Sequence, residues 1–522
     1  MIHIRTNDEA VDAKYMIEQA CIKISPLYLF INEQQIEAID QRSFELTVEW
    51  GRLIIYIWDD ERSSSWRVRA CEIKASGVDL LATNGPGGPG RESVLISLRE
   101  GLSRQVDEPD LKQKRENYAE SLREAIKRKF RLATMVRATT GPGRQQGVPG
   151  RYARILMKQK GEKIMVMGVC GDEAQADIDS VIAAGLIWIG NTKNKPVRLV
   201  FCLPQGRSQT AIERLSLIDL SHLKARLECY EYDQEKSELT PVVPLSQGEL
   251  LNRHPYDLEW PGDNLSSAIW RSRILSLAPD LIEVRPRTGD DGEGFFIHGL
   301  EFARRAGNLG TIKFGIAGQT GPSMPILTEA SFKDLERLVG SIGRFRCAGS
   351  PDRRHPFYRL RAEAWLESLL RRDIHSIDLA LDERYVYSQI PTWRAEERYV
   401  IDLLTVRQES DGSHRLVVIE IKAVEDLQLP LQGLDYWLRI EQARIRNEFE
   451  RRGLFRGIRL ADKPPLLYLV APRLRFHRSF ETVSGCISSQ IELFRVGINT
   501  NWREGVKVHS VDRCDSAIIK QL

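Results

Sequence analysis

The sequence lacks the features that mark membrane-bound, secreted and disulfide-linked proteins. No run approaches the roughly 18 apolar residues that a membrane-spanning helix needs, and the polar start MIHIRTNDEAVDAKY is unlike a secretory signal. The cysteines are scattered without a CxxC pair, which disfavours a zinc site and favours buried thiols in a reducing compartment. They are Cys21, Cys71, Cys170, Cys202, Cys229, Cys347, Cys486 and Cys514. We therefore expect a cytoplasmic protein without membrane contact.

An excess of charge of one sign is also missing. The net charge is only +3, because 75 Lys and Arg are offset by 72 Asp and Glu. An argument for a nucleic-acid partner must therefore come from local charge. Residues 112–160 hold 14 Lys or Arg against three acids, and residues 439–478 hold 11 against four. Both stretches would suit a phosphate backbone, although a charged run can also be a plain solvated face.

Length and composition predict several domains of mixed structure. The chain has 522 residues, and a domain takes about 150. Apolar content is 42% and charged content 28%, which is typical of globular proteins. We expect an α/β fold class, a multidomain α+β protein. Its expected parts are a mainly-β domain (1–105), a basic helix and Gly/Pro loop linker (106–158), an α/β module (159–250), an α+β connecting region (251–350) and a C-terminal domain (351–522).

Local patterns support these divisions. Residues 43–83 read as successive strands with turn residues between them, and residues 110–138 have a helical pattern. The Gly/Pro stretch 84–93 lacks the Gly-Lys-Ser/Thr of a phosphate-binding loop. Glu72 and Lys74 form a Glu-x-Lys pair, and Asp59 or Asp60 could supply a strand acid before it. We interpret these charges as ion pairs on a solvated sheet face.

The most informative stretch runs from Arg398 to Trp437. A β-branched strand at residues 399–406 carries Asp402, and a second strand at residues 416–423 carries Glu420 and Lys422. Glu420 and Lys422 are two residues apart, so they point to the same face of their strand. Charged side chains seldom occupy apolar strands unless they are paired or bind metal. We therefore expect two acids and a lysine to converge at neighbouring strand ends.

Such a group suits a hard divalent cation. Mg²⁺ takes oxygen ligands, usually one or two carboxylates with waters filling the rest of its shell. Asp402, Glu420 and the backbone carbonyl of Ile421 are the expected ligands for Mg²⁺ or Mn²⁺. A metal of this kind can activate water and neutralise phosphate charge. Lys422 would orient that water or stabilise the developing charge.

Two helices frame this stretch. Upstream, the run RAEAWLESLL places Glu363 and Glu367 one turn apart on one face. Downstream, LPLQGLDYWLRI places Gln432 and Tyr436 at the same spacing. The ordered set of helix Glu, strand Asp, strand Glu-x-Lys and helix Gln/Tyr is far more specific than Glu-x-Lys alone.

This ordered set resembles the PD-(D/E)XK nuclease superfamily, and within it the nuclease domain of archaeal and actinobacterial mismatch-type DNA endonucleases. The resemblance covers residues 357–470 and departs from the pattern at Ile401, where a proline often stands. It implies a restriction-endonuclease-like αβββαβ domain in residues 351–522. It also implies that Glu363 or Glu367 completes the metal shell and that Gln432 and Tyr436 contact the site or the scissile strand.

The expected function is therefore a metal-dependent endonuclease that hydrolyses phosphodiester bonds of DNA, in a role such as repair or defence against foreign DNA. The expected partner is nucleic acid, and a homodimer or a separate motor or defence partner is left open. The alternative is a nucleic-acid-binding or assembly protein with an inactive nuclease-like fold. In that case the basic stretch 112–160 would carry the function.

Overall fold

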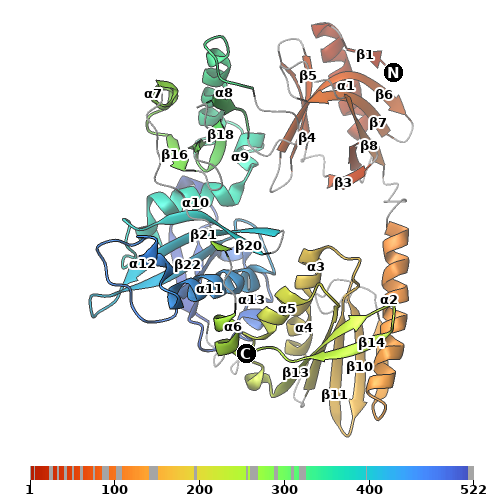
Figure 1. The fold of residues 1–522 in the computed structure, drawn as a ribbon. Coiled ribbons are helices and arrows are strands. Elements are labelled where there is room, and N and C mark those ends of the chain that lie inside the picture. The colour runs from red at the N-terminus through yellow and green to blue at the C-terminus, as the bar shows by residue number, and fades with distance from the viewer. Residues whose placement is uncertain are drawn as a thin grey trace. The chain divides into compact units, whose positions relative to one another are not determined.

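The computed structural model divides the chain into two compact units, each built from two stretches of sequence. The first unit comprises Met1–Gln105 and Glu259–Leu369, and the second comprises Val106–Leu258 and Leu370–Leu522 (Figure 1). The structure describes residues 2–4, 6–22, 27–31, 34–39, 44–49, 52–58, 63–74, 77–84, 93–100, 108–139, 151–192, 197–253, 257–258, 269–286, 292–306, 311–316, 325–394 and 397–514. The mixture of helices and sheets agrees with the expected multidomain α+β class.

An eight-stranded antiparallel sheet forms the N-terminal part of the first unit. Its strands run in the order β3-β2-β8-β7-β6-β5-β4, with β1 paired to β6. Helix α1 (Asn7–Ile22) packs on this sheet through Ala10, Ala13 and Ile17, whose spacing puts them on one helix face. The strands are β1 (Ile2–His3), β2 (Leu27–Ile31), β3 (Gln34–Ile39), β4 (Phe44–Glu49), β5 (Arg52–Trp58), β6 (Ser63–Lys74), β7 (Gly77–Asn84) and β8 (Ser93–Glu100).

The strands expected between residues 43 and 83 are thus present. Lys74 Nζ lies 2.6 Å from Asp79 and 3.5 Å from Glu72, so these charges form ion pairs on the sheet, as interpreted above. Asp59, Asp60 and residues 85–92 of the Gly/Pro stretch lie outside the described residues.

A four-stranded antiparallel sheet and four helices complete the first unit. The strands are β16 (Ile282–Pro286), β17 (Glu293–Ile297), β18 (Leu300–Ala306) and β19 (Thr311–Phe314), and the helices are α7 (Ile269–Leu277), α8 (Phe332–Phe345), α9 (Pro356–Arg359) and α10 (Ala362–Arg372). The fully buried Arg346 follows α8 and donates hydrogen bonds to the carbonyls of His298, Leu360 and Arg361. These bonds tie the start of α10 to the turn between β17 and β18.

The second unit contains a six-stranded sheet in the order β14-β13-β12-β11-β10-β9. Strands β9, β10 and β11 are antiparallel, β11, β12 and β13 are parallel, and β14 is antiparallel to β13. The strands are β9 (Thr134–Thr139), β10 (Ala153–Gln159), β11 (Glu162–Gly168), β12 (Val197–Pro204), β13 (Ala225–Asp233) and β14 (Glu238–Val242). Its helices are α2 (Glu108–Lys129), α3 (Gln175–Asp179), α4 (Val181–Gly190) and α5 (Gln209–Leu215).

The helical pattern expected for residues 110–138 is wrong at its end. Helix α2 ends at Lys129, and Thr134–Thr139 form strand β9 instead. Strand β9 lies at the sheet edge and is mostly exposed, so it lacks the alternation of apolar residues that signals a strand. Residues 108–139 and 151–159 therefore build a sheet and its covering helix, where a linker was expected.

A seven-stranded sheet forms the rest of the second unit, in the order β15-β20-β21-β22-β23-β24-β25. The strands are β15 (Asp257–Leu258), β20 (Tyr387–Arg394), β21 (Glu397–Gln408), β22 (His414–Ile421), β23 (Leu466–Pro472), β24 (Leu493–Ile498) and β25 (Val508–Arg513). Its helices are α11 (Leu429–Ile445), α12 (Glu448–Arg451) and α13 (Phe480–Ser484). Along the chain the elements run α10-β20-β21-β22-α11-α12-β23, with most of α10 in the first unit and the strands in the second.

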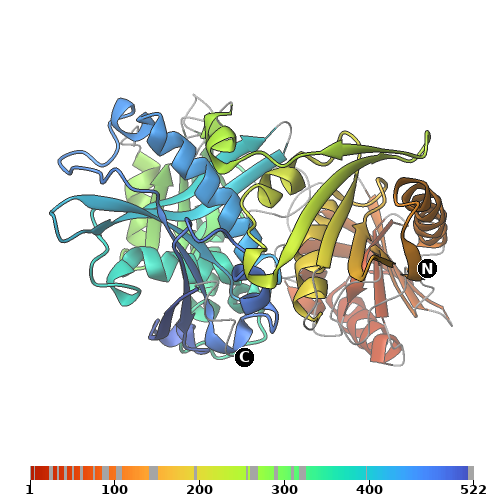
Figure 2. The same cartoon turned by 90° about the horizontal axis from the view of Figure 1, so that it is seen from below.

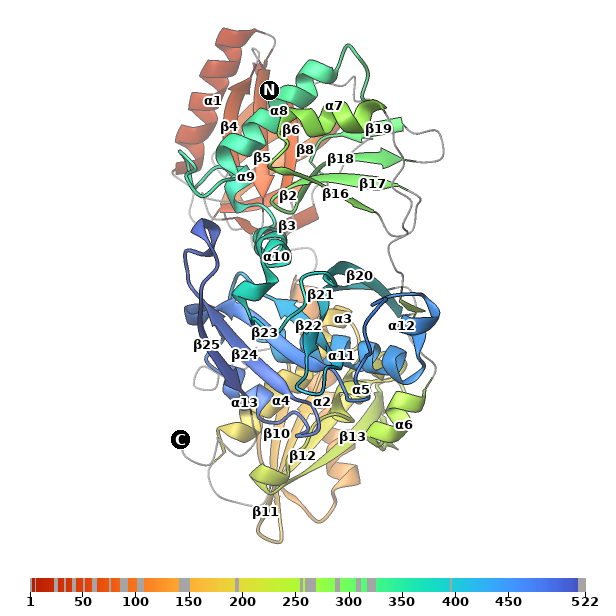
Figure 3. The same cartoon turned by 90° about the vertical axis from the view of Figure 1, so that its left-hand side faces the viewer.

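The two sheets of the second unit are joined through helices. Helices α4 and α5 of one half meet α11 and α13 of the other, with a sheet beyond each pair (Figures 2 and 3). Arg214 on α5 forms a bidentate ion pair with Asp435 on α11, and both side chains are buried. Gln442 near the end of α11 donates to the carbonyl of Leu250 on α6 (Gln247–Asn252) at 2.9 Å.

All eight cysteines are free thiols, and six of them are buried. Among the described residues, no helix is both long and apolar enough to cross a membrane.

We expect Arg214→Ala to lower the free energy of unfolding by about 3–5 kcal/mol, because it leaves the Asp435 carboxylate buried without its partner. Urea unfolding followed by tryptophan fluorescence measures the change. Arg459→Ala is the matched control, since its ion pair with Asp411 is exposed at 70% and 64% and should contribute at most about 1 kcal/mol. Equal effects of the two changes would contradict a buried, structure-forming pair.

Candidate active site

The pairing of β21 with β22 brings Asp402 and Glu420 together. The two strands are antiparallel, and their last paired residues toward this end are Leu403 and Ile419. One step further in the same register, Asp402 lies across from Glu420. Residues that face each other across an antiparallel pair point to the same side of the sheet, with Cβ atoms about 5 Å apart. Lys422 follows two residues after Glu420 and shares that side.

Hydrogen bonds fix the position of Asp402. Its Oδ2 accepts a bond from the backbone N–H of Ile421 at 2.9 Å, which links the two strands at the point where their pairing ends. Its Oδ1 lies 3.5 Å from the side-chain nitrogen of Gln389 on β20. Gln389 has a φ of 53°, a left-handed conformation that is uncommon for a residue other than glycine. The sequence analysis missed Gln389, since nothing in its local pattern signals this backbone.

Glu420 is almost fully buried, with 2% of its surface exposed. Its Oε1 lies 3.3 Å from Lys422 Nζ, and the same ammonium lies 3.9 Å from Asp426. A buried carboxylate is costly unless a cation compensates its charge, and Lys422 supplies that cation here. Asp426 is a second residue that the sequence analysis did not select, although it stands only four positions after Lys422.

Helix α11 places Tyr436 against this group. The ring is buried, and burial together with the nearby Glu420 and Asp402 carboxylates raises the pKa of Tyr436 well above its usual value. The Arg439 guanidinium, missed in the sequence analysis, lies 5.7 Å from the Tyr436 ring centre. Gln432 is one turn earlier on the same side of the helix. Its buried Oε1 accepts no hydrogen bond from the described residues.

The two upstream glutamates, Glu363 and Glu367, lie on α10 in the part of the helix that belongs to the first unit. Glu367 is 1% exposed and both of its oxygens lie within 3.3 Å of Arg285 Nη1 on β16. Glu363 is only half-buried. Glu367 is thus engaged in a structural ion pair with Arg285. A role for either one at the metal stays a prediction.

The donor set near Asp402 consists of oxygen atoms. Asp402 and Glu420 provide carboxylates, and Ile421 provides a backbone carbonyl beside the N–H that Asp402 holds. No group of three or more His, Cys, Asp or Glu side chains within the described ranges is arranged to hold a metal. A cation here would therefore need water or substrate oxygens for the rest of its shell, which is usual for Mg²⁺.

Much of the positive charge noted in the sequence is paired internally. Within residues 439–478, Arg444 contacts Glu441 and Asp462, and Lys463 contacts Glu409. Within α2, Arg115 binds Glu173. These pairs reduce the charge that either stretch can offer to a phosphate backbone.

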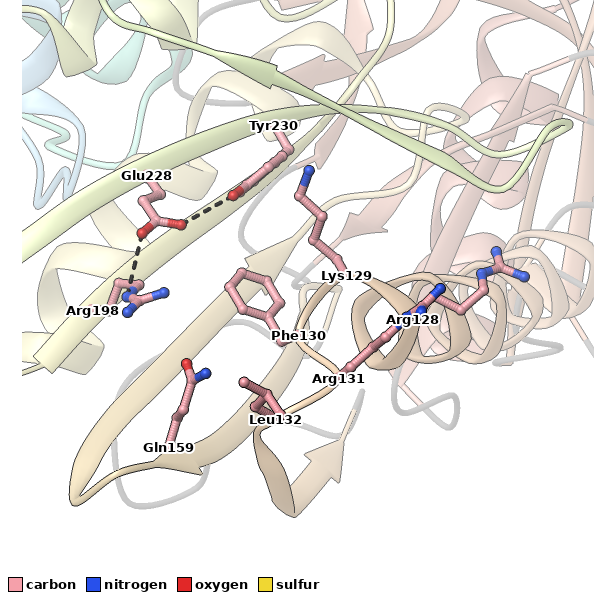
Figure 4. A pocket seen from close by; sticks show the side chains of 9 residues that line it. All are labelled: Arg128, Lys129, Phe130, Arg131, Leu132, Gln159, Arg198, Glu228 and Tyr230. Atoms are coloured by element: carbon pink, nitrogen blue, oxygen red, sulfur yellow. Dashed lines mark hydrogen bonds and ion pairs between the residues drawn. The ribbon is translucent and has the colours of Figure 1, made fainter.

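A basic pocket lies at the end of α2 (Figure 4). It is open, has a volume of about 740 Å³ and is lined by Arg128, Lys129, Phe130, Arg131, Leu132, Gln159, Arg198, Glu228 and Tyr230. Arg198 contacts Glu228 at 3.3 Å, and Glu228 in turn accepts a bond from the Tyr230 hydroxyl. Lys129 lies over the Tyr230 ring at 5.1 Å. The cations would suit an anionic ligand, whereas the two aromatic lining residues, Phe130 and Tyr230, are each only 8% exposed.

No protein-family model matches this chain, and no curated protein matches it.

We expect Glu367→Ala to lower the free energy of unfolding by about 2–3 kcal/mol, because it removes a buried ion pair and leaves Arg285 with Glu283 as its remaining carboxylate partner. Glu363→Gln keeps size and should be clearly less destabilising, since Glu363 is only half-buried. Urea unfolding of both variants measures the difference. Equal losses would contradict a structural role that is specific to Glu367.

Proposed function

We propose that the chain is a metal-dependent nuclease that hydrolyses phosphodiester bonds of DNA. The observation that carries this proposal is the set Asp402, Glu420 and Lys422 on neighbouring strand ends. Two carboxylates face one side of the sheet, one of them is nearly fully buried, and an ammonium lies 3.3 Å from it. Buried acids of this kind are more often found at functional sites than in structural cores.

The donor set fits Mg²⁺ or Mn²⁺. Both cations prefer oxygen ligands, and two carboxylates with a backbone carbonyl are a common protein contribution to such a site. Asp402 Oδ2 accepts a hydrogen bond from Ile421 N–H and Oδ1 lies 3.5 Å from the Gln389 amide, so a metal bound by Asp402 would share its carboxylate with these donors. Bound there, the metal would lower the pKa of a water and neutralise charge on the phosphate.

The remaining residues have separate roles. Lys422 holds its ammonium beside Glu420, where it would stabilise charge on the attacked phosphate or orient the attacking water. Tyr436 stays protonated because its pKa is raised, so its hydroxyl remains a hydrogen-bond donor at neutral and mildly alkaline pH. The buried Oε1 of Gln432 is suited to accept a bond from water or from substrate.

Element order supports assignment to the PD-(D/E)XK superfamily. In those enzymes the acid of the second strand and the Glu-x-Lys of the third strand are followed by a helix with Gln or Tyr. Here Asp402 lies on β21, Glu420 on β22 with Lys422 just after it, and Gln432 and Tyr436 on α11. We therefore also propose that residues 351–522 form a restriction-endonuclease-like domain.

The test is cleavage of plasmid and oligonucleotide DNA by the full chain with Mg²⁺ or Mn²⁺. We expect Asp402→Asn and Lys422→Ala each to slow cleavage at least about 100-fold, because the first weakens binding of the metal that would neutralise the phosphate and the second removes the ammonium that would stabilise the developing charge. We also expect Asp402→Asn, and not Lys422→Ala, to abolish Mn²⁺ binding measured by calorimetry. Asp411→Asn and Lys463→Ala are the matched controls, since both residues are exposed in the same domain. Wild-type protein that folds but cuts no DNA with either metal would refute the proposal.

A second candidate function is nucleic-acid binding without cleavage. The basic pocket at the end of α2 favours it, because Arg128, Lys129 and Arg131 are among its lining residues and need no metal to hold phosphate.

We expect the double variant Arg128→Glu and Arg131→Glu to weaken binding of a fluorescent oligonucleotide at least about 10-fold and to reduce its salt dependence. The charge-matched control is Arg451→Glu with Arg452→Glu, at the exposed end of α12. Equal binding by wild type and both double variants would exclude the pocket as a nucleic-acid site.

A further inference from the structure

The two sheets of the second unit follow the same path. Strands β9 to β14 and strands β20 to β25 each occur in unbroken spatial order, and the corresponding pairs have the same directions. In each set three antiparallel strands are followed by two parallel strands and a final antiparallel one. Helices α4 and α5 fill the crossovers of the first set as α11 and α13 do in the second. A complete match of order and direction over six strands indicates one fold present twice.

Glycines on the crossover helices align the two copies residue by residue. A Cβ on Gly433 of α11 would lie 2.5 Å from Leu469 and 3.2 Å from Leu467, both on β23. A Cβ on Gly185 of α4 would lie 2.5 Å from Phe201 and 3.7 Å from Leu199, both on β12. Only glycine lets each helix lie this close to its strand. Leu469 therefore corresponds to Phe201, and both strands end on a proline three residues later, at Pro472 and Pro204.

The contacts between the copies are reciprocal. Helix α4 packs on α13, and its counterpart α11 packs on α5. Ile218 after α5 forms an antiparallel bridge with Ile487 after α13. The two flanking hydrogen bonds run from Asp219 N to Cys486 O at 2.8 Å and from Ser488 N to Leu217 O at 2.9 Å. A shift of 269 positions converts each bond into the other, which is the signature of a two-fold axis between equivalent surfaces.

The catalytic set is present in only one copy. Glu420 pairs with Leu469 across β22 and β23, and Met167 pairs with Phe201 across β11 and β12. Met167 therefore occupies the position of Glu420, and Val169 occupies that of Lys422. Arg154 pairs with Met167, as Asp402 lies across from Glu420, and Arg154 is 5% exposed.

The helix positions differ in the same way. Gly185 aligned on Gly433 puts Ala184 in place of Gln432 and Trp188 in place of Tyr436. Two acids, a lysine and a glutamine are thus replaced by one buried arginine and by side chains that cannot bind a metal.

We propose that the second unit is a built-in dimer of one fold that has a single cleavage centre, so that it cuts one strand of duplex DNA per encounter. The strand-cutting part rests on the proposed nuclease function. A two-fold arrangement presents equivalent sheet ends to the two strands of a duplex, whose backbones are themselves related by two-fold symmetry. The set Asp402, Glu420 and Lys422 stands at only one of those ends, which allows hydrolysis of only one strand. The copy formed by residues 108–242 acts as the non-catalytic half.

The experiment follows supercoiled plasmid with the full chain and Mg²⁺ or Mn²⁺, over time and over a range of protein concentrations. We expect nicked circles to accumulate first and linear DNA to form later by independent nicks, with Asp402→Asn leaving the plasmid intact. Linear DNA as the first product would overturn the proposal while leaving the nuclease function in place. Plasmid left supercoiled by wild type would refute the nuclease function and, with it, the strand-cutting part.

The internal two-fold arrangement of the second unit can be tested without a cleavage assay. Ile218 and Ile487 form a non-hydrogen-bonded antiparallel pair, and the Cα atoms of such a pair lie about 4.5 Å apart. A disulfide can span that distance. We expect the double variant Ile218→Cys and Ile487→Cys to lose two free thiols on mild oxidation while the chain stays monomeric on a non-reducing gel. Each single variant, Ile218→Cys or Ile487→Cys alone, is the control that detects a disulfide formed with the neighbouring Cys486 in place of the intended one. Retention of both thiols, or a cross-link between two chains, would overturn the intramolecular arrangement.

Discussion

Helix α11 is the element on which the second unit depends, because it is buried along nearly its whole length. Fourteen of its 17 residues are buried, although its sequence contains several charged and polar groups. A helix that is covered on all sides needs a partner for every polar side chain. One face meets β22 and β23, where Gly433 allows close approach, and another meets α5, where Asp435 receives Arg214. Tyr436 between these faces is held against the acids of the strands.

The acids at the strand ends impose a second constraint. Asp402 and Glu420 share one side of the sheet, and the buried carboxylate of Glu420 is costly unless a cation lies close by. Lys422 and the Ile421 N–H satisfy part of that demand. A divalent cation would satisfy it more fully, since its charge matches two carboxylates. This balance explains why an arrangement costly to a structural core is suited to phosphoryl chemistry.

The duplicated fold shows how much sequence change one arrangement of strands can accept. Between the copies, the apolar positions of the parallel strands and the helix glycine are kept, whereas the charged positions are replaced. Packing requires only apolar volume and close approach at those sites. Hydrolysis requires particular atoms at particular places. A copy with Arg154, Met167 and Val169 in place of Asp402, Glu420 and Lys422 can therefore keep its fold and its reciprocal interface.

The sequence alone predicts β21, β22 and the set Asp402, Glu420 and Lys422, whereas Gln389, Asp426 and Arg439 come only from the structure. Short apolar, β-branched runs define the two strands, and the two-residue spacing of Glu420 and Lys422 places them on one face whatever the rest of the fold does. Edge strand β9 escaped prediction because it is exposed, and the backbone of Gln389 escaped because pairing with β21 imposes it. The Glu367–Arg285 pair, the Arg214–Asp435 pair and the Ile218–Ile487 bridge between the two sheets' halves join residues 82, 221 and 269 positions apart. Contacts at such separations leave no periodic trace in a local stretch of sequence, so only the tertiary structure decides them.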